Sequence, residues 1–542
     1  IYNFESPMDV PGLEGAMYPN IFRSYEISQD FKTFTFYMRE GMKWSDGEPL
    51  TTESVRFAWE DALLNEQITS VFPTFLKNGA SPRGEPGTLK ILDDYRFSVS
   101  FTEPYGGFAI QLTRPCHWRS YQTILKPKHH LTQFHVDYTP LDKLEPLIKE
   151  ESLAAGEWWT LFTTKDVNRW GMARSISIGL PALGPFQTVE ETAVGTVVME
   201  RNAYYWKADT AGNQLPYFDR HLGVMAETPE MAIMMVMSGE GDHSYEYAFL
   251  GDYPIYKENE EKGGYVTVIA RMHRTMVDVC LNYTLDDENW RQVVRDHRFR
   301  LALTSAINRE ELIEAVYLGF AKPPEDIPSE FDPDQANALL DEMGMDQRDG
   351  DGFRLGPDGN TFVLPIETDG RMPEFMASGE LLREYFSEVG IKTTVKQVEG
   401  ALFNERINAN EMPCSLQWNS HPEMWCYTCD TWPFSYFNPN APLWVDYLQT
   451  DGATGENPEE SELGKAYVAA CEVMWKTMAD PDHMRLDNIA AYSKIMYENI
   501  FRIPTVGEGN YAVLVSNDIG NVPYSGYGIA QNFCGEVFFR KA

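Results

Sequence analysis

The sequence predicts a protein of the α/β class with more than one domain, and three observations lead to this prediction. The chain has 542 residues, too many for one compact core, and its 43% hydrophobic residues can fill two or three domains. Residues 34–60 join a strand pattern, a polar turn and a helix start. Residues 351–400 alternate strand and helix patterns, as layered α/β domains do.

The first of these blocks lies in residues 34–60. Bulky apolar side chains alternate at strand period across residues 34–38. Residues 45–47, Ser-Asp-Gly, then supply turn chemistry. A helix should follow, because Thr51 or Thr52 can cap its first turn. Its bulky apolar face consists of Val55, Phe57, Ala58 and Trp59.

Later segments predict one further strand and three further helices. Residues 95–101 alternate apolar and polar side chains, as a strand does. Residues 299–317 repeat apolar side chains at near-helical spacing, and Asn308 should cap the second of two helices there. Residues 331–344 predict another helix. Its cap, first residue and stop are Asp332, Pro333 and Gly344.

Composition excludes several classes of function. A net charge of −36 without a run of Lys or Arg disfavours nucleic acid and anionic lipid surfaces as partners. The sequence holds no stretch of about 20 apolar residues that would span a membrane. Seven cysteines are too few for a disulfide scaffold. The numbered chain starts at Ile1 without a signal peptide, so export cannot be read from it directly.

Several phrases spread along the chain resemble those of one known family. They lie at residues 39–59 (REGMKWSDGEPLTTESVRFAW), 127–131 (PKHHL), 183–207, 212–221, 238–247, 296–320 and 331–344. Together they resemble the extracellular solute-binding proteins of family 5, which are the peptide-, nickel- and oligosaccharide-binding receptors of ABC importers. The resemblance extends over nearly the whole chain.

The resemblance implies a two-lobed periplasmic-binding-protein-like α/β fold of type II, with an extra subdomain inserted in lobe one. The expected segments are 1–27 (lobe one), 28–178 (inserted subdomain), 179–267 (lobe one), 268–503 (lobe two) and 504–542 (lobe one). Two chain crossings, near 268–272 and 503–506, should form the hinge between the lobes.

The densest group of potential ligand-binding side chains lies in residues 415–434. Three tryptophans recur there at intervals of seven, at 418, 425 and 432. Prolines at 422 and 433 argue against one continuous helix, so we expect a strand end that passes into a loop. The candidate ligand-binding residues are Gln417, Trp418, Asn419, His421, Trp425 and Trp432, with Tyr245 and Glu246 from lobe one.

The kind of ligand follows from this segment and from the resemblance. Peptide-binding members of the family place an aspartate here, against the amino terminus of the peptide. This chain has Asn419-Ser420-His421 at that place, so an oligosaccharide is expected first and an oligopeptide second. Stacking a sugar on one indole buries about 60 Å² and contributes roughly 1.5 kcal/mol. Micromolar affinity needs about −8 kcal/mol, so the polar candidates must also bind hydroxyl groups.

Two other interpretations of these residues stay open. Each tryptophan of the 415–434 segment could instead be a core residue of the second lobe, because large aromatic side chains dominate cores. For a second aromatic group, at Trp158, Trp159 and Trp170, core packing is favoured over ligand contact.

A metal site is not favoured. Cys414, His421, Cys426 and Cys429 could be drawn as a zinc set, but they lack two regularly spaced pairs. A disulfide between Cys426 and Cys429, or two buried thiols, explains that pair better. No cofactor is expected.

The function expected from these observations is that of a binding receptor. No hydrolase elbow, P-loop or H-E-x-x-H motif is present, and an acidic secreted glycosidase is the alternative from another class. The expected partners are a small solute and ABC permease subunits, and the protein is expected to be a monomer in the periplasm or a lipoprotein at the cell surface.

Overall fold

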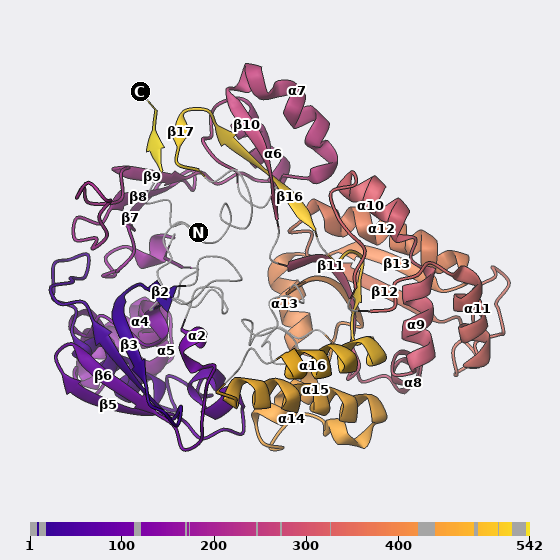
Figure 1. Cartoon of the computed structure of the whole chain (residues 1–542), viewed down its shortest axis with the longest axis horizontal. Helices are drawn as coiled ribbons and strands as arrows, with labels where there is room; N and C mark the ends of the chain where they lie inside the picture. Colours follow the sequence, from indigo (N-terminus) through magenta and orange to yellow (C-terminus); the bar gives the residue numbers. More distant parts are fainter. Residues whose placement is uncertain are drawn as a thin grey trace.

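The computed structural model describes residues 8–9, 18–112, 121–167, 171–172, 174–244, 248–271, 274–325, 327–420, 440–481, 486–507, 509–522 and 538–541. In Figure 1 these segments follow one another around the centre of the molecule. Residues 18–165 lie at the lower left, residues 186–271 at the left and top, and residues 274–507 at the right.

A four-stranded antiparallel sheet forms the first body of the chain. Its strands are, in spatial order, β3 (Phe22–Ile27), β4 (Thr33–Met38), β6 (Arg96–Ser100) and β5 (Thr88–Asp93). Phe34, Phe36 and Met38 of β4 are buried while their neighbours are half-buried, so the alternation of residues 34–38 is confirmed. Strand β6 confirms the second predicted strand.

Short helices cover this sheet and extend it. Helix α1 (Thr52–Arg56) begins where predicted, because Thr51 Oγ1 accepts a hydrogen bond from the N–H of Glu53, and it continues as the π-helix η1 (Phe57–Leu63). The 3₁₀-helices η2 (Thr74–Leu76) and η3 (Asn78–Ala80) and helix α2 (Phe108–Gln111) complete its edge. Helices α3 (Lys128–Leu131), α4 (Leu141–Glu150) and α5 (Trp158–Lys165) form a separate core around η1.

The separate core around η1 contains two tryptophans of the second aromatic group described for the sequence. Trp158 is buried in it and Trp159 packs against it from a partly buried position. The core interpretation of these two residues is therefore confirmed, and Trp170 lies outside the described residues.

Two smaller sheets follow in the chain. Strands β7 (Phe186–Glu191), β8 (Val197–Arg201) and β9 (Arg220–Gly223) form an antiparallel sheet in that order. Strand β10 (Tyr265–Arg271) pairs antiparallel with β16 (Asn510–Ser516), from near the end of the chain. Helices α6 (Pro229–Met237) and α7 (Tyr253–Gly263) pack against this pair.

The second body is built on a five-stranded mixed sheet. Its spatial order is β13 (Lys392–Gln397), β12 (Val363–Thr368), β14 (Cys414–Ser420), β11 (Arg274–Leu281) and β15 (Ile503–Pro504). Strands β13 and β14 are parallel to β12, and β11 is antiparallel to both of its neighbours. The alternation of strands and helices predicted for residues 351–400 is thus confirmed.

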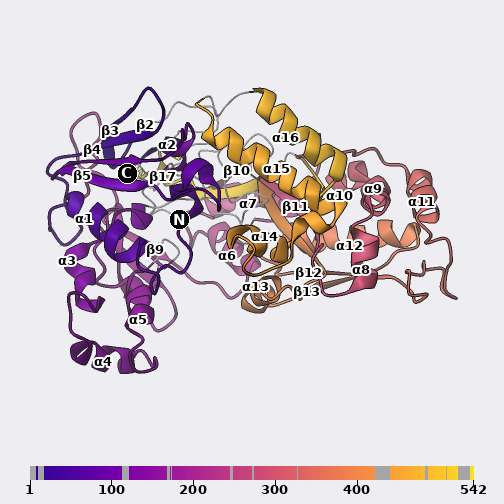
Figure 2. The same ribbon diagram turned by 90° about the horizontal axis from the view of Figure 1, so that it is seen from below.

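Helices surround this sheet on both sides. They are α8 (Glu288–Val294), α9 (His297–Ala306), α10 (Arg309–Tyr317), α11 (Pro333–Glu342), α12 (Pro373–Glu388), α13 (Gly400–Asn408), α14 (Pro442–Gln449), α15 (Glu462–Ala479) and α16 (Leu486–Asn499). The predicted caps are present. Asn308 Oδ1 accepts from the N–H of Glu311 at 3.2 Å, and Asp332 Oδ1 accepts from the N–H of Gln335 at 2.8 Å. Figure 2 shows α14, α15 and α16 together over one side of this body.

Two chain connections join the bodies. Strand β10 leads into β11, and β15 leads back into β16. Beside them, the N–H of Thr505 donates to the carbonyl of Val277 at 2.9 Å. We use the name lobe one for the elements from β3 to β10 together with β16, and lobe two for the elements from β11 to β15.

Candidate functional site

Strand β14 carries the first part of the predicted site. Its register places Gln417 opposite Asp278 and Asn419 opposite Thr275, so the strand ends at Ser420 beside the start of β11, next to the connection from lobe one. Trp418 and Asn419 therefore belong to the last residues of a strand, as the sequence predicts, although their side chains lie outside what the structure describes.

Most of the other predicted residues cannot be placed. His421, Trp425, Trp432, Tyr245 and Glu246 lie outside the described residues, as do Cys426 and Cys429. The residues that flank 245–247 are described. His243 pairs with Val515 and Ala248 with Ala512, both on β16, and Ser244 exchanges two hydrogen bonds of 2.9 Å with Leu514.

Among the predicted site residues, Gln417 is the one with a side chain that the structure describes. It is buried, and its Nε2 has no hydrogen-bond partner among the described residues. A buried amide donor without a partner costs free energy unless a ligand or water binds it. Gln417 is therefore placed to donate to an acceptor that reaches the sheet.

Asp278 and Arg502 lie beside Gln417 and were missed from the sequence. Asp278 stands opposite both Gln417 and Pro504 in the sheet, and its Oδ2 accepts a hydrogen bond from Arg502 Nη1 at 3.1 Å. The two side chains are 1% and 10% exposed. One signal could have found Asp278: it is the single acid of the strand RTMVDVCL and stands between two valines.

Four residues, Ser415, Gln417, Asp278 and Glu367, form a row of polar side chains on one face of the five-stranded sheet, which we call the polar row. Leu416 faces α12, because a Cβ added at Gly379 of that helix would lie 3.2 Å from Leu416 Cδ1. Side chains alternate along a strand, so Ser415 and Gln417 point to the opposite face. Asp278 and Glu367 stand opposite these two residues in the ladder and share that face.

The charges in the polar row are paired. Asp278 binds Arg502, and both carboxylate oxygens of Glu367 accept from Arg406 Nη1 at 2.5 Å. Ser415 Oγ has no partner among the described residues. The row thus combines neutral donors and acceptors with compensated ion pairs.

No metal or thiolate chemistry is supported in the described part of the chain. It contains no group of three or more His, Cys, Asp or Glu residues that could hold a metal ion. Cys280, Cys414 and Cys471 are buried free thiols. Burial raises the pKa of the Cys414 thiol well above its ordinary value, so this group stays protonated and is a poor metal ligand.

Among the described helices, none has both the length and the apolar composition required to cross a bilayer.

The fold defines a class of protein. Two α/β lobes joined by two strand connections are the type II fold of periplasmic binding proteins, and solved structures of that class align with the entire chain. An oligopeptide-binding protein OppA aligns with a TM-score of 0.63 at 26% identity and is covered over 88% of its length. The periplasmic binding protein MelB of Agrobacterium fabrum C58, solved with stachyose, aligns with a TM-score of 0.74 at 19% identity, over 80% of its length.

Sequence comparison gives the family. Residues 16–425 match the bacterial extracellular solute-binding proteins, family 5 Middle, and the chain belongs to this family. It is 24% identical to the periplasmic alpha-galactoside-binding protein of Rhizobium meliloti (strain 1021), over 96% of this chain and 73% of that protein. It is also 24% identical to the periplasmic oligopeptide-binding protein OppA of Salmonella typhimurium, over 57% of this chain and 48% of that protein.

Membership of this family decides between two classes of function. Its members are binding receptors and not enzymes, so the protein is a solute-binding receptor and the glycosidase alternative is set aside.

Proposed function

We propose that the protein is the receptor of an ABC importer and that it captures an oligosaccharide between its two lobes. The solute is then delivered to the permease subunits of the importer. The receptor works as a monomer outside the cytoplasm, in the periplasm or tethered to the cell surface by a lipid. No cofactor takes part.

The observation that carries this proposal is the Gln417 donor, which has no partner within the described part of the chain, beside the compensated pair of Asp278 and Arg502. A peptide ligand carries a charged amino terminus, which an uncompensated carboxylate binds more strongly than a neutral acceptor does. A sugar offers neutral hydroxyl groups, which exchange hydrogen bonds with amide and ion-pair groups and stack on indoles. The likeness to an alpha-galactoside-binding protein over 96% of this chain supports the same ligand class.

The proposed site joins residues of both lobes. In lobe two it consists of Gln417, Trp418, Asn419, His421, Trp425 and Trp432, together with Asp278 and Arg502. In lobe one it includes Tyr245 and Glu246, in a segment flanked by two pairings with β16.

The proposed mechanism is closure of the lobes on the ligand. Both chain connections between the lobes lie in neighbouring strands, which supports a hinge near 268–272 and 503–506. A ligand that contacts both lobes binds the closed form better than the open form and so shifts the population towards it. The permease then recognises the closed receptor.

Calorimetry with two probes tests the ligand class. The tetrasaccharide stachyose should bind, and tetra-alanine should not. Trp418→Ala should weaken stachyose binding about tenfold, because one stacked ring contributes roughly 1.5 kcal/mol. Trp159→Ala, a partly buried tryptophan of the α5 core, is the matched control and should leave affinity unchanged.

An oligopeptide is the second candidate, since oligopeptide-binding proteins are also similar in sequence and fold. Binding of tetra-alanine without stachyose would establish it and contradict the oligosaccharide. Native mass spectrometry of the protein as purified adds an independent test, because a retained solute would add hexose or pentose masses in one case and amino-acid residue masses in the other.

A further inference from the structure

The lobes touch at a second place, away from the chain connections. The segment before α2 in lobe one lies against the last turn of α15 in lobe two. The N–H of Gly107 donates to the carbonyl of Met478 at 2.9 Å, and the N–H of Gly106 donates to the carbonyl of Ala479 at 3.3 Å. Figures 1 and 2 both show the start of α2 beside the end of α15.

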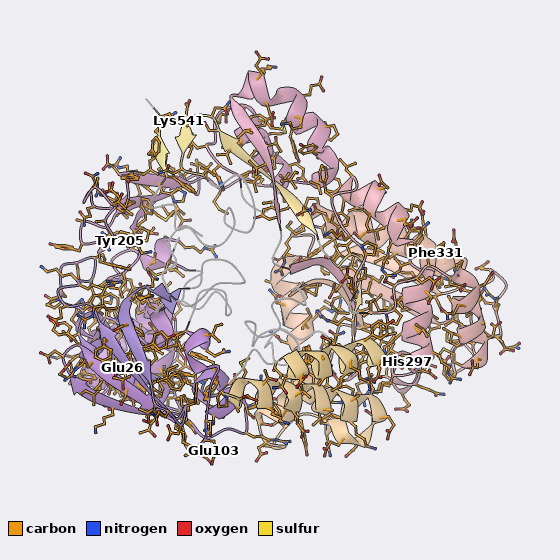
Figure 3. The ribbon with its side chains drawn as sticks, in the orientation of Figure 1. Glu26, Glu103, Tyr205, His297, Phe331 and Lys541 are labelled. Atoms are coloured by element: carbon orange, nitrogen blue, oxygen red, sulfur yellow. The ribbon has the colours of Figure 1, made fainter. Side chains whose placement is uncertain are left out.

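This contact lies across the molecule from the hinge. In Figure 1, β10 and β16 run above the centre, and α2 meets α15 at the lower edge. Figure 3 labels Glu103, three residues before Gly106, at that edge. A rotation of the lobes displaces atoms in proportion to their distance from the axis. A rotation about the strand connections would therefore move the two sides of this contact further apart than it moves atoms near the hinge.

Apolar packing reinforces the two hydrogen bonds. Met478 belongs to α15 of lobe two, yet it is 2% exposed within the hydrophobic core of the four-stranded sheet of lobe one. Gln111 Nε2 of α2 lies 3.3 Å from Met478 Sδ. Tyr492 of α16 packs against the hydrophobic cores of both lobes. The contact between the lobes thus includes the burial of one apolar side chain, Met478, as well as the two hydrogen bonds.

The absence of a side chain at Gly106 makes this approach possible. A Cβ there would lie 2.0 Å from the carbonyl oxygen of Asp480 and 2.7 Å from Cα of Pro481, closer than any real contact. Its three nearest atoms all belong to lobe two. A side chain at this position would therefore obstruct the contact between the lobes.

Gly107 is restricted in the same way but less severely. A Cβ there would lie 2.9 Å from Met478 Sδ, the end of a flexible side chain, and 3.2 Å from the carbonyl oxygen of Met478. Two adjacent positions thus offer a strong and a weaker obstruction of the same contact.

We propose that Gly106, Gly107 and residues 478–480 form a latch that is made when the lobes close and broken when they open. The proposal rests on the receptor function above and identifies positioning residues for it. In the open form the two N–H groups and two carbonyls bind water, so opening leaves no backbone group unpaired. In the closed form the latch adds to the stabilisation by the ligand, so affinity depends on residues that do not touch the solute.

The test compares Gly106→Ala and Gly107→Ala with the wild type. Gly350→Ala is the matched control, because a Cβ at Gly350 has no atom within 4 Å and its φ is not positive. Three properties are measured with and without stachyose: calorimetric affinity, hydrogen exchange of segments 105–108 and 477–481, and the radius of gyration by X-ray scattering. Thermal unfolding of each variant checks that it is folded.

The latch predicts a graded result. Gly106→Ala should bind stachyose at least tenfold more weakly, exchange the amides of both segments faster and stay expanded when stachyose is added. Gly107→Ala should fall between it and the wild type, and Gly350→Ala should match the wild type. Equal exchange and equal scattering in Gly106→Ala and the wild type would overturn the latch.

The same measurements also distinguish a failure of the proposed ligand class from a failure of the latch. If the wild type does not bind stachyose, the proposed ligand class fails. The latch is then judged on the protein alone, where slower exchange in the wild type than in Gly106→Ala supports it and equal exchange overturns it.

If Gly106→Ala does not fold, Met478→Gln replaces it and weakens the same contact from lobe two. In that case weaker binding and faster exchange of segment 105–108 support the latch, and wild-type values for both overturn it.

Discussion

Arg502 donates a hydrogen bond from Nη1 to Oδ2 of Asp278 at 3.1 Å, which joins residues 224 positions apart. Asp278 lies in β11, shortly after the chain enters lobe two, and Arg502 stands just before the chain returns to lobe one. The side chains are almost completely buried. The ion pair thus links the incoming and outgoing strands of lobe two beside the proposed ligand site.

Removal of one partner of this pair should destabilise the protein. Asp278→Ala leaves Arg502 without its buried counter-charge, and such changes cost about 3–5 kcal/mol. Urea unfolding should show this loss. The double variant Asp278→Leu/Arg502→Leu should recover much of the stability, because it removes both charges together. If the pair also contacts the ligand, this double variant still binds stachyose poorly. Wild-type affinity in the double variant would show that the pair is structural alone.

Gln417→Leu should separate binding from folding. The leucine has a similar volume and removes a buried donor that has no partner among the described residues, so stability to urea should change by less than about 1 kcal/mol. Stachyose affinity should fall about tenfold, the loss of one hydrogen bond of ~1.4 kcal/mol. The matched control is Gln397→Leu, at the exposed end of β13. Unchanged affinity in Gln417→Leu would remove Gln417 from the site.

Arg354 should be essential for the stability of lobe two. Its side chain is 1% exposed, and it donates to the carbonyls of Val389 and Met345 at 2.8 and 2.6 Å and to Asp341 Oδ1 at 2.5 Å. Arg354→Ala leaves the carbonyls of the buried residues Val389 and Met345 without this donor and should lower the free energy of unfolding by about 3–5 kcal/mol. The exposed Arg383→Ala on α12 is the control, with an expected change under about 1 kcal/mol. Similar unfolding midpoints for the two variants would contradict the prediction.

The local elements could be predicted from the sequence because their signals are local. Phe34, Phe36 and Met38 alternate at strand period, and Asn308 and Asp332 cap helices through bonds to residues three positions on. Gln417 could be predicted as a site residue, but its position beside Asp278 and Arg502 could not, because pairing between strands distant in sequence brings these residues together. The same holds for Gly106, whose requirement for glycine arises from residue 480 of the other lobe.

Glu374 should make stability depend on pH. It is buried at the start of α12, where its Oε1 accepts from the N–H of Leu250 in lobe one at 3.4 Å. Burial raises the pKa of this carboxyl to about 7 from its ordinary value of 4.5. Between these values the folded protein holds a proton that the unfolded chain has lost, so the free energy of unfolding falls as pH rises. The total change is about 3 kcal/mol, on the order of 1.4 kcal/mol for each unit of pKa difference.

The test is urea unfolding of the wild type and Glu374→Gln at pH 5 and pH 7.5. Glutamine does not titrate, so the stability of Glu374→Gln relative to the wild type should be higher at pH 7.5 than at pH 5 by roughly 2 kcal/mol, the part of the total change that falls in this interval. Glu384→Gln, at an exposed position of the same helix, should show no such difference. Equal relative stability at the two pH values would contradict the prediction. It would mean that the carboxyl of Glu374 has the same pKa in the folded protein as in the unfolded chain, because water or a movement of the lobes gives it access to solvent.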